Sequence, residues 1–188
     1  MTKRSKQEAR HSYLYPENHL HDTERRWFAV WVEVKCEKMA AELLAKKHIE
    51  TYLPLQKKMR HYSRQRPRLV ELPLIPGYVF VKIVNEEYLS VLQTEKVKGF
   101  LRVRKNLLCI PEREINLLRY ILGQTEYGVF LFNQNLQVGD RVRVVRGPFM
   151  NQRGVLAKQK NKHVFVMRLE NLDQNIAIEI PKEDLERI

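Results

Sequence analysis

Two aromatic-rich stretches, 27–34 and 78–83, consist almost entirely of apolar residues and predict β-strands. Side chains alternate between the two faces of a strand, so each strand gathers rings on one face. The shared aromatic face carries Trp27, Trp31, Tyr78 and Phe80. If the strands lie side by side, these rings form one platform, which is either a buried core face or an open groove for a partner.

A Pro76-Gly77 turn precedes the second of these strands. Proline fixes its own backbone dihedral and glycine tolerates positive φ, so the pair is typical of a tight turn. We expect this turn to set the register of the strand that follows it.

The spacing of apolar residues also predicts three helices. The first has an amphipathic stripe at Cys36, Met39, Ala40, Leu43 and Leu44. A short second helix follows Asn85 as its N-cap, and a third begins at Pro111 and ends at Gly123. Further strands are expected at 49–55 and 99–104.

The order of these elements predicts four segments. Residues 1–25 are polar without apolar periodicity, which predicts a flexible tail. Strands and helices alternate from 26 to 123, which predicts an α+β domain, an α/β sandwich with one sheet and about three helices. Residues 124–135 are predicted to be a linker, although the apolar run 129–132 is unusual for one. Short strands and turns over 136–188 indicate a small β-barrel.

Charge points to the class of partner. The chain has 34 lysines and arginines against 22 acidic residues, so its net charge is +12 and its field attracts polyanions such as nucleic acid.

Cys36 and Cys109 lie far apart without metal-ligand spacing, so we expect no metal, no cofactor and reduced thiols in the cytoplasm. No segment is long and apolar enough to suggest a membrane span.

The strongest concentration of positive charge is the stretch 57–68, predicted as an exposed basic loop or loose hairpin. Its candidate nucleic-acid contacts are Lys57, Lys58, Arg60, Tyr62, Arg64, Arg66 and Arg68. Arginines bind phosphates and a tyrosine ring stacks on an unpaired base, a combination that suits single strands as well as duplexes. A merely solvated surface explains the same composition equally well.

Several segments, in order, carry a resemblance to a known family: WFAV at 27–30, IPGYVFV at 75–81, VKGFL at 97–101 and VGDRVRVVRGPF at 138–149, followed by GVL at 154–156. Together they resemble the NusG family of transcription elongation factors. The resemblance implies an amino-terminal NusG domain up to residue 123 and a KOW-type barrel over 136–188.

The resemblance also implies a partner and a surface. In the family, an apolar groove of the first domain binds the clamp helices of the largest RNA polymerase subunit and suppresses pausing or termination. The positions that correspond to this groove are Trp27, Phe28, Trp31, Ile75, Pro76, Gly77, Tyr78 and Phe80. An aromatic platform suits such docking, because a helix in an apolar groove buries area against rings.

The barrel is implied to bind the ribosome or the termination factor Rho. Candidate contacts there are Phe149, Phe165 and Leu172. Family members often have an aromatic residue where this chain has Leu172, which puts that coupling in doubt. Many also have an aromatic residue before the Pro-Gly-Tyr sequence, where this chain has Ile75.

These departures, together with the basic stretch and the tail, favour a specialised paralogue of the RfaH or UpxY antiterminator type. Such a protein is recruited to particular operons through non-template DNA or nascent RNA. The alternatives are a general NusG-type elongation factor and, in a different class, a ribosomal RNA-binding KOW protein. No catalytic motif is found in the sequence, so we expect a monomeric binding protein and no enzyme.

Overall fold

The computed structural model describes residues 19–62, 65–103, 106–107, 109–124, 126–132, 139–159, 162–169, 172 and 174–188. Within these ranges the chain forms two compact units. The first contains the described residues up to Leu53 together with Pro76–Arg113, and the second contains Pro54–Ile75 and Glu114–Ile188. This division differs from the expected boundaries, because residues 54–75 and the third helix group with the carboxy-terminal residues.

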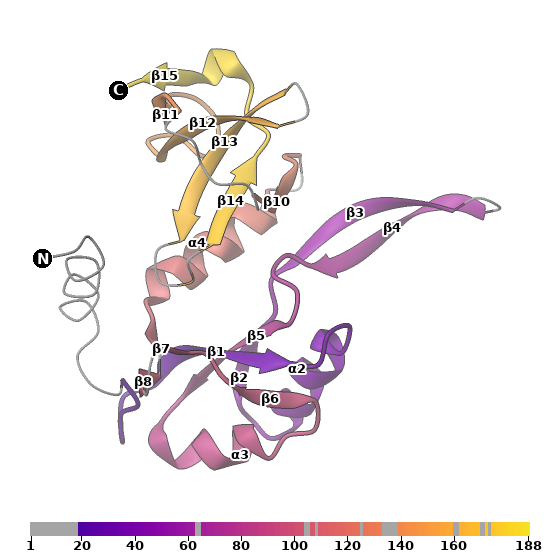
Figure 1. Ribbon diagram of the computed structural model, residues 1–188, viewed down its shortest axis with the longest axis vertical. Coiled ribbons are helices and arrows are strands. Elements are labelled where there is room, and N and C mark those ends of the chain that lie inside the picture. The colour runs from indigo at the N-terminus through magenta and orange to yellow at the C-terminus, as the bar shows by residue number, and fades with distance from the viewer. Residues whose placement is uncertain are drawn as a thin grey trace, which may run out of the picture. The chain divides into compact units, whose positions relative to one another are not determined.

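The first unit is built on an antiparallel sheet whose central strand is β1 (Arg26–Val32) (Figure 1). The strand order is β2-β5-β1-β6, and β9 also pairs with β1. The other strands are β2 (Glu50–Tyr52), β5 (Tyr78–Ile83), β6 (Val97–Phe100) and β9 (Cys109–Ile110). The short pair β7 (Arg102–Val103) and β8 (Asn106–Leu107) forms a separate sheet. The two aromatic strands are therefore neighbours, which is the arrangement that an aromatic platform requires.

Two helices and a 3-10 turn belong to this unit. They are α2 (Glu37–Lys46), η1 (Asn85–Glu87) and α3 (Tyr88–Leu92). The main core cluster joins one face of the sheet to Ala40 and Leu44 of α2 and to Val91 of α3, all three fully buried. Burial of each large aliphatic side chain stabilises the fold by roughly 1.5–3 kcal/mol. The apolar stripe predicted for the first helix is thus confirmed at Ala40 and Leu44, whereas Met39 is 42% exposed and Cys36 precedes the helix.

The N-cap expected at Asn85 differs in the structure. Asn85 is the first residue of η1, and Val84 is the residue that precedes the turn. The carboxylate of Glu87 accepts a hydrogen bond from the backbone N–H of Val84, with a distance of 3.0 Å. The Glu87 carboxylate, three residues further along the chain, therefore accepts from a free backbone N–H at the start of the helix, the role that had been expected of the Asn85 side chain.

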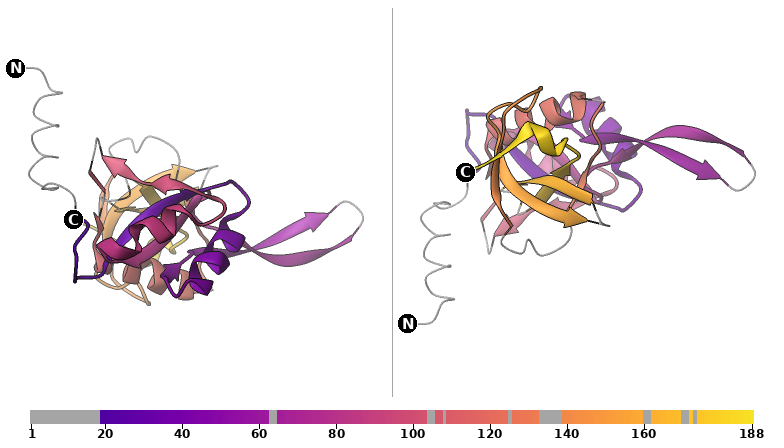
Figure 2. Two further views of the ribbon diagram at one scale, coloured as in Figure 1. Left: turned by 90° about the horizontal axis from the view of Figure 1, so that it is seen from below. Right: turned by 90° about the horizontal axis from the view of Figure 1, so that it is seen from above.

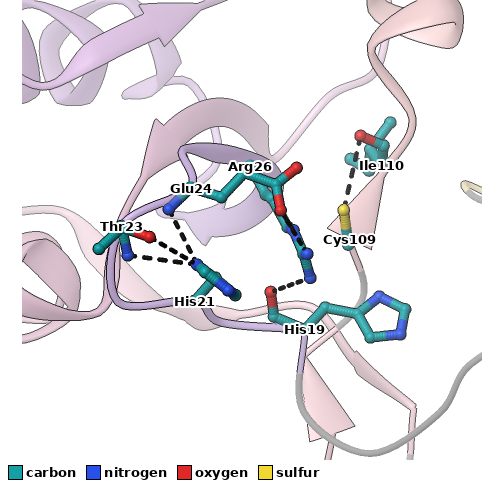
Figure 3. Close-up of polar contacts among 7 residues, drawn as sticks. All are labelled: His19, His21, Thr23, Glu24, Arg26, Cys109 and Ile110. Atoms are coloured by element: carbon teal, nitrogen blue, oxygen red, sulfur yellow. Dashed lines mark hydrogen bonds and ion pairs between the residues drawn. The ribbon is translucent and has the colours of Figure 1, made fainter.

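Part of the expected tail lies against the first unit. The Nδ1 atom of His21 accepts hydrogen bonds from the backbone N–H groups of Thr23 (3.2 Å) and Glu24 (2.9 Å), which closes a tight turn (Figure 3). The guanidinium of Arg25 forms a bidentate pair with the carboxylate of Glu87, at 2.8 and 2.9 Å. Residues 19–25 are thus attached by specific bonds, whereas the tail prediction for residues 1–18 lies outside the described residues.

The second unit begins with a long antiparallel hairpin, β3 (Leu55–Tyr62) and β4 (Gln65–Pro73). Figures 1 and 2 show the two strands as a twisted ribbon. No other described strand pairs with either of them. The basic stretch is therefore a hairpin, one of the two forms that the sequence predicted.

Helix α4 (Glu112–Gly123) corresponds to the predicted third helix, and it ends at Gly123 as expected. Its apolar positions Ile115, Leu118 and Ile121 are fully buried. Glu114, also buried, lies on the same helix.

The remainder of the second unit is a six-stranded antiparallel sheet with the order β10-β14-β13-β12-β11-β15. Its strands are β10 (Val129–Leu131), β11 (Arg141–Val144), β12 (Arg153–Gln159), β13 (Lys162–Leu169), β14 (Gln174–Ile178) and β15 (Leu185–Arg187), with the turn η2 (Lys182–Asp184) before the last. The linker prediction was wrong for β10, because Val129 pairs with Ile178 and Leu131 with Ile176. The apolar run that was unusual for a linker is a strand of this sheet.

Gly154 marks a close approach of two strands in this sheet. A Cβ atom at this position would lie 2.5 Å from the carbonyl oxygen of Val166 and 2.6 Å from the ring of Phe165. Neither atom belongs to a flexible chain end, so glycine is required here by the packing of β12 against β13.

Candidate functional site

Among the described residues of the first unit, the most exposed aromatic feature is a cross-strand pair formed by Trp31 of β1 and Tyr78 of β5. The two residues are direct partners in the sheet register, and their ring centroids are 5.1 Å apart at an angle of 48°. Trp31 is 49% exposed and Tyr78 is partly buried, which raises the pKa of its phenol. We call these two residues the ring pair.

A buried carboxylate holds the turn in front of Tyr78. Gly77 has a φ of +81°, and its backbone N–H donates to Oε1 of Glu37 at 2.8 Å. Its carbonyl accepts from the N–H of Val32 at 2.9 Å. Glu37 is only 4% exposed and is the first residue of α2, so the turn is tied both to a helix and to the central strand. Sequence reasoning missed this role, because 40 residues separate the carboxylate from the turn.

The other predicted groove residues are mostly in the interior. Trp27, Phe28, Ile75 and Phe80 are each at most 4% exposed, and Phe28 belongs to the core cluster on the opposite face of the sheet. Phe80 stacks on Tyr52 with a centroid distance of 6.2 Å, and the ammonium of Lys82 lies 5.8 Å from the Trp27 ring centroid. Pro76 is exposed and Gly77 is buried. The accessible part of the predicted surface is therefore the ring pair with Pro76.

Side chains of the hairpin alternate between its two faces along each strand. Lys57 lies opposite Glu71, and Met59 lies opposite Leu69, so these four share one face. On the other face Lys58 lies opposite Val70, and Arg60 lies opposite Arg68. The register shifts between Arg60 and Tyr62, so the alternation does not extend to Arg66, which is exposed. The predicted side-chain roles of Tyr62 and Arg64 lie outside the described residues.

Two large apolar side chains are exposed on the first of these faces. Met59 is 52% and Leu69 is 61% exposed. The sequence contains part of the signal for this arrangement, since Met59 interrupts the run of cations 57–60 and Leu69 follows its last cation, Arg68. The candidate list for the stretch had considered only its cations and its tyrosine.

The candidate contacts of the barrel are core residues. Phe149, Phe165 and Leu172 are 1%, 0% and 8% exposed. The Phe149 ring makes edge-to-face contacts with Tyr120 of α4 and with Tyr127, at centroid distances of 6.0 and 5.1 Å. The hydroxyl of Tyr120 donates to the carbonyl of Pro148. These residues hold the second unit together and present little surface to a partner.

Other kinds of site find little support in the described part of the chain. Among those residues no cluster of three or more His, Cys, Asp or Glu side chains is arranged to hold a metal ion. No helix in the described ranges has the length and apolar character needed to span a membrane. Both cysteines are free thiols, and burial raises the pKa of the Cys109 thiol.

Comparison with known proteins decides the family. A family described as "Transcription termination factor nusG" matches residues 25–119, which is half of the chain. The chain belongs to the NusG family. This confirms the resemblance seen in the sequence and, with it, membership of a family of transcription termination and antitermination factors.

Individual relatives agree with this assignment. The NusG-family chain is 32% identical over 103 residues to the transcription termination/antitermination protein NusG of Streptococcus pyogenes serotype M3, and the match spans 52% of this chain and 56% of the streptococcal protein. It is 24% identical over 181 residues to NusG of Staphylococcus epidermidis, covering 87% of this chain and 96% of the relative.

A solved structure supports the fold. The structure titled "Domain interaction in Thermotoga maritima NusG" superposes with a TM-score of 0.58 at 21% identity, and the match covers 88% of this chain and 98% of that one. This likeness in fold confirms the predicted fold class, an amino-terminal NusG domain followed by a KOW-type barrel.

Proposed function

We propose that this NusG-family chain is a transcription elongation and antitermination factor that binds the clamp helices of RNA polymerase through the ring pair, Trp31 and Tyr78. The observation that supports this proposal is the ring pair itself. Two large rings at the exposed end of two central strands are unusual for a surface without a partner.

The geometry suits a partner helix. Trp31 and Tyr78 stand beside each other at 5.1 Å on neighbouring strands, so they present one continuous apolar surface. The strands are fixed by the core below, and the turn before Tyr78 is fixed by Glu37. A rigid aromatic anchor loses little entropy on binding and is the type of residue that dominates interface energies.

The expected contribution can be estimated. A tryptophan side chain buries at most about 250 Å², so covering the 49% of Trp31 that is exposed removes roughly 120 Å² from water. At about 25 cal/mol per Å², this corresponds to about 3 kcal/mol before the costs of association.

The test is co-purification of core RNA polymerase with the full chain. We expect Trp31→Ala and Tyr78→Ala each to weaken binding by about 30-fold or more, which corresponds to about 2 kcal/mol. Leu89→Ala is the matched control, because Leu89 is a 62% exposed apolar residue on α3, outside the ring pair. Equal binding by all variants would contradict the proposal.

The proposed scope is a specialised one, with recruitment to particular operons through non-template DNA or nascent RNA. It is supported by the long hairpin with its exposed cations. Chromatin occupancy measures the scope directly. Signal confined to a few operons supports a specialised paralogue, whereas signal on nearly all transcribed genes indicates a general NusG-type factor.

The barrel as a partner of the ribosome or Rho is a weaker proposal, since its three candidate residues are buried. Sedimentation with ribosomal subunits in the absence of polymerase distinguishes a ribosomal KOW protein from the function proposed here. Co-sedimentation without polymerase binding would favour the ribosomal alternative.

A further inference from the structure

The cations of the β3–β4 hairpin are not spread evenly around the ribbon. Three of them, Lys58, Arg60 and Arg68, fall on one face by the alternation of the two strands, and all three are exposed. We call this the cationic face. Its other described positions are Gln56, Val70 and Leu72, so it contains no carboxylate among the residues described.

The opposite face has a different chemistry. Its one lysine, Lys57, lies directly across from Glu71, so the local charges offset each other. The next pair along the ribbon is Met59 with Leu69, both more than half exposed. This face therefore offers a phosphate group little net attraction, even though it belongs to the same basic stretch.

The arrangement on the cationic face suits a phosphodiester backbone. Arg60 and Arg68 are direct cross-strand partners, so their two guanidinium-bearing side chains leave the ribbon on the same face from neighbouring positions. A guanidinium binds phosphate oxygens in a bidentate manner. Along β3 the two cations of this face, Lys58 and Arg60, lie two residues apart, roughly 6.8 Å. That spacing equals about two phosphate repeats of one strand along a duplex axis.

We propose that the cationic face of the β3–β4 hairpin lies against the phosphodiester backbone of a nucleic acid, with Arg60 and Arg68 as the central pair, and that the opposite face takes no part. This inference rests on the proposed function, which assigns nucleic acid to the hairpin, and it adds which side of the hairpin binds.

Adjacent lysines provide the decisive comparison. Lys58→Gln and Lys57→Gln remove the same charge from neighbouring exposed residues of one strand, but from opposite faces. Binding of the full chain is measured by fluorescence anisotropy against three probes, namely single-stranded DNA, duplex DNA and single-stranded RNA, at several salt concentrations. Circular dichroism of each variant checks that the fold is intact.

We expect Lys58→Gln to weaken binding about threefold and Arg60→Gln/Arg68→Gln about tenfold or more, uniformly across sequences. Lys57→Gln should change the affinity less than twofold, because exposed charges more than about 8 Å away are screened at physiological salt. Each lost contact should reduce the salt slope by about 0.9 on duplex and about 0.7 on a single strand, so the slope also identifies the form bound.

Three results would overturn the inference: equal losses for Lys57→Gln and Lys58→Gln, no loss for the arginine double variant, or no binding of the parent chain to any of the three probes. Polymerase co-purification of the same variants separates this failure from failure of the proposed function. The hairpin variants should retain polymerase, and Trp31→Ala should retain the affinity for the nucleic-acid probe.

Discussion

Removal of the Glu37 carboxylate tests whether the turn before Tyr78 depends on one buried acceptor. In Glu37→Ala the N–H of Gly77, a buried residue, loses its 2.8 Å partner. An unsatisfied buried donor costs about 1–3 kcal/mol, so we expect about 2 kcal/mol of lost stability. Glu37→Gln keeps an oxygen that can accept the bond and should cost about 1 kcal/mol or less.

The chain contains a convenient reporter for this measurement. Its only two tryptophans, Trp27 and Trp31, both lie on β1, so intrinsic fluorescence follows unfolding of the first unit alone. For a unit of this size, 2 kcal/mol corresponds to a fall in melting temperature of roughly 8–16 °C. Glu42→Ala is the control, because Glu42 is an exposed acidic residue of the same helix and should change stability by less than about 0.5 kcal/mol.

Two outcomes would refute this reasoning. If Glu37→Ala were as stable as the parent chain, the hydrogen bond to Gly77 would contribute nothing. If Glu37→Gln were as damaging as Glu37→Ala, the charge of the carboxylate would matter and its role as an acceptor would not. Polymerase co-purification with Glu37→Gln then shows whether the ring pair keeps its arrangement.

Three further predictions concern other positions. Gly154→Ala should destabilise the second unit by about 2–3 kcal/mol through its clash with the Val166 carbonyl, seen by circular dichroism but not in tryptophan fluorescence. At pH 8, Cys109 in a Cys36→Ser variant should react with iodoacetamide more slowly when folded than in urea, because burial raises its thiol pKa. Burial also raises the pKa of the Tyr78 phenol, so the folded state holds the phenol proton to a higher pH than the unfolded state. The free energy of unfolding should be unaffected below about pH 10 and should fall above it. Alkaline unfolding curves of Tyr78→Phe should lack this fall.

Local patterns in the sequence predicted most of the first unit. The period-two alternation placed Trp31 and Tyr78 on one face of neighbouring strands, and the structure pairs them directly. The stripe at Ala40 and Leu44 likewise predicted the buried side of α2. These signals succeed because alternation and helical spacing are properties of a few consecutive residues.

Features set by distant contacts could not be predicted. Strand β10 has only three residues, and its partner β14 begins more than 40 residues later, so the apolar run at Val129–Leu131 was visible in the sequence but its pairing was not. Alternation also does not reveal which end of a strand is covered. Trp27 and Trp31 share a face of β1, yet one is 1% and the other 49% exposed.

The same limit applies to the candidate site. The basic stretch was visible as a list of cations, but only the register of the hairpin separates Lys57 from Lys58. The sequence could not indicate that Glu37 supports the turn, since its contact depends on where α2 packs.

The hairpin has one consequence for the behaviour of the protein at high concentration. In the described structure β3 and β4 pair only with each other, so the outer side of each strand has backbone groups with no strand beside it. Such edges promote strand addition between copies, and lysine, arginine and proline on them oppose it. Lys58, Arg66, Pro67 and Arg68 therefore act against self-association as well. Variants that neutralise several of these residues at once should precipitate more readily, and adding polyanion should not rescue them.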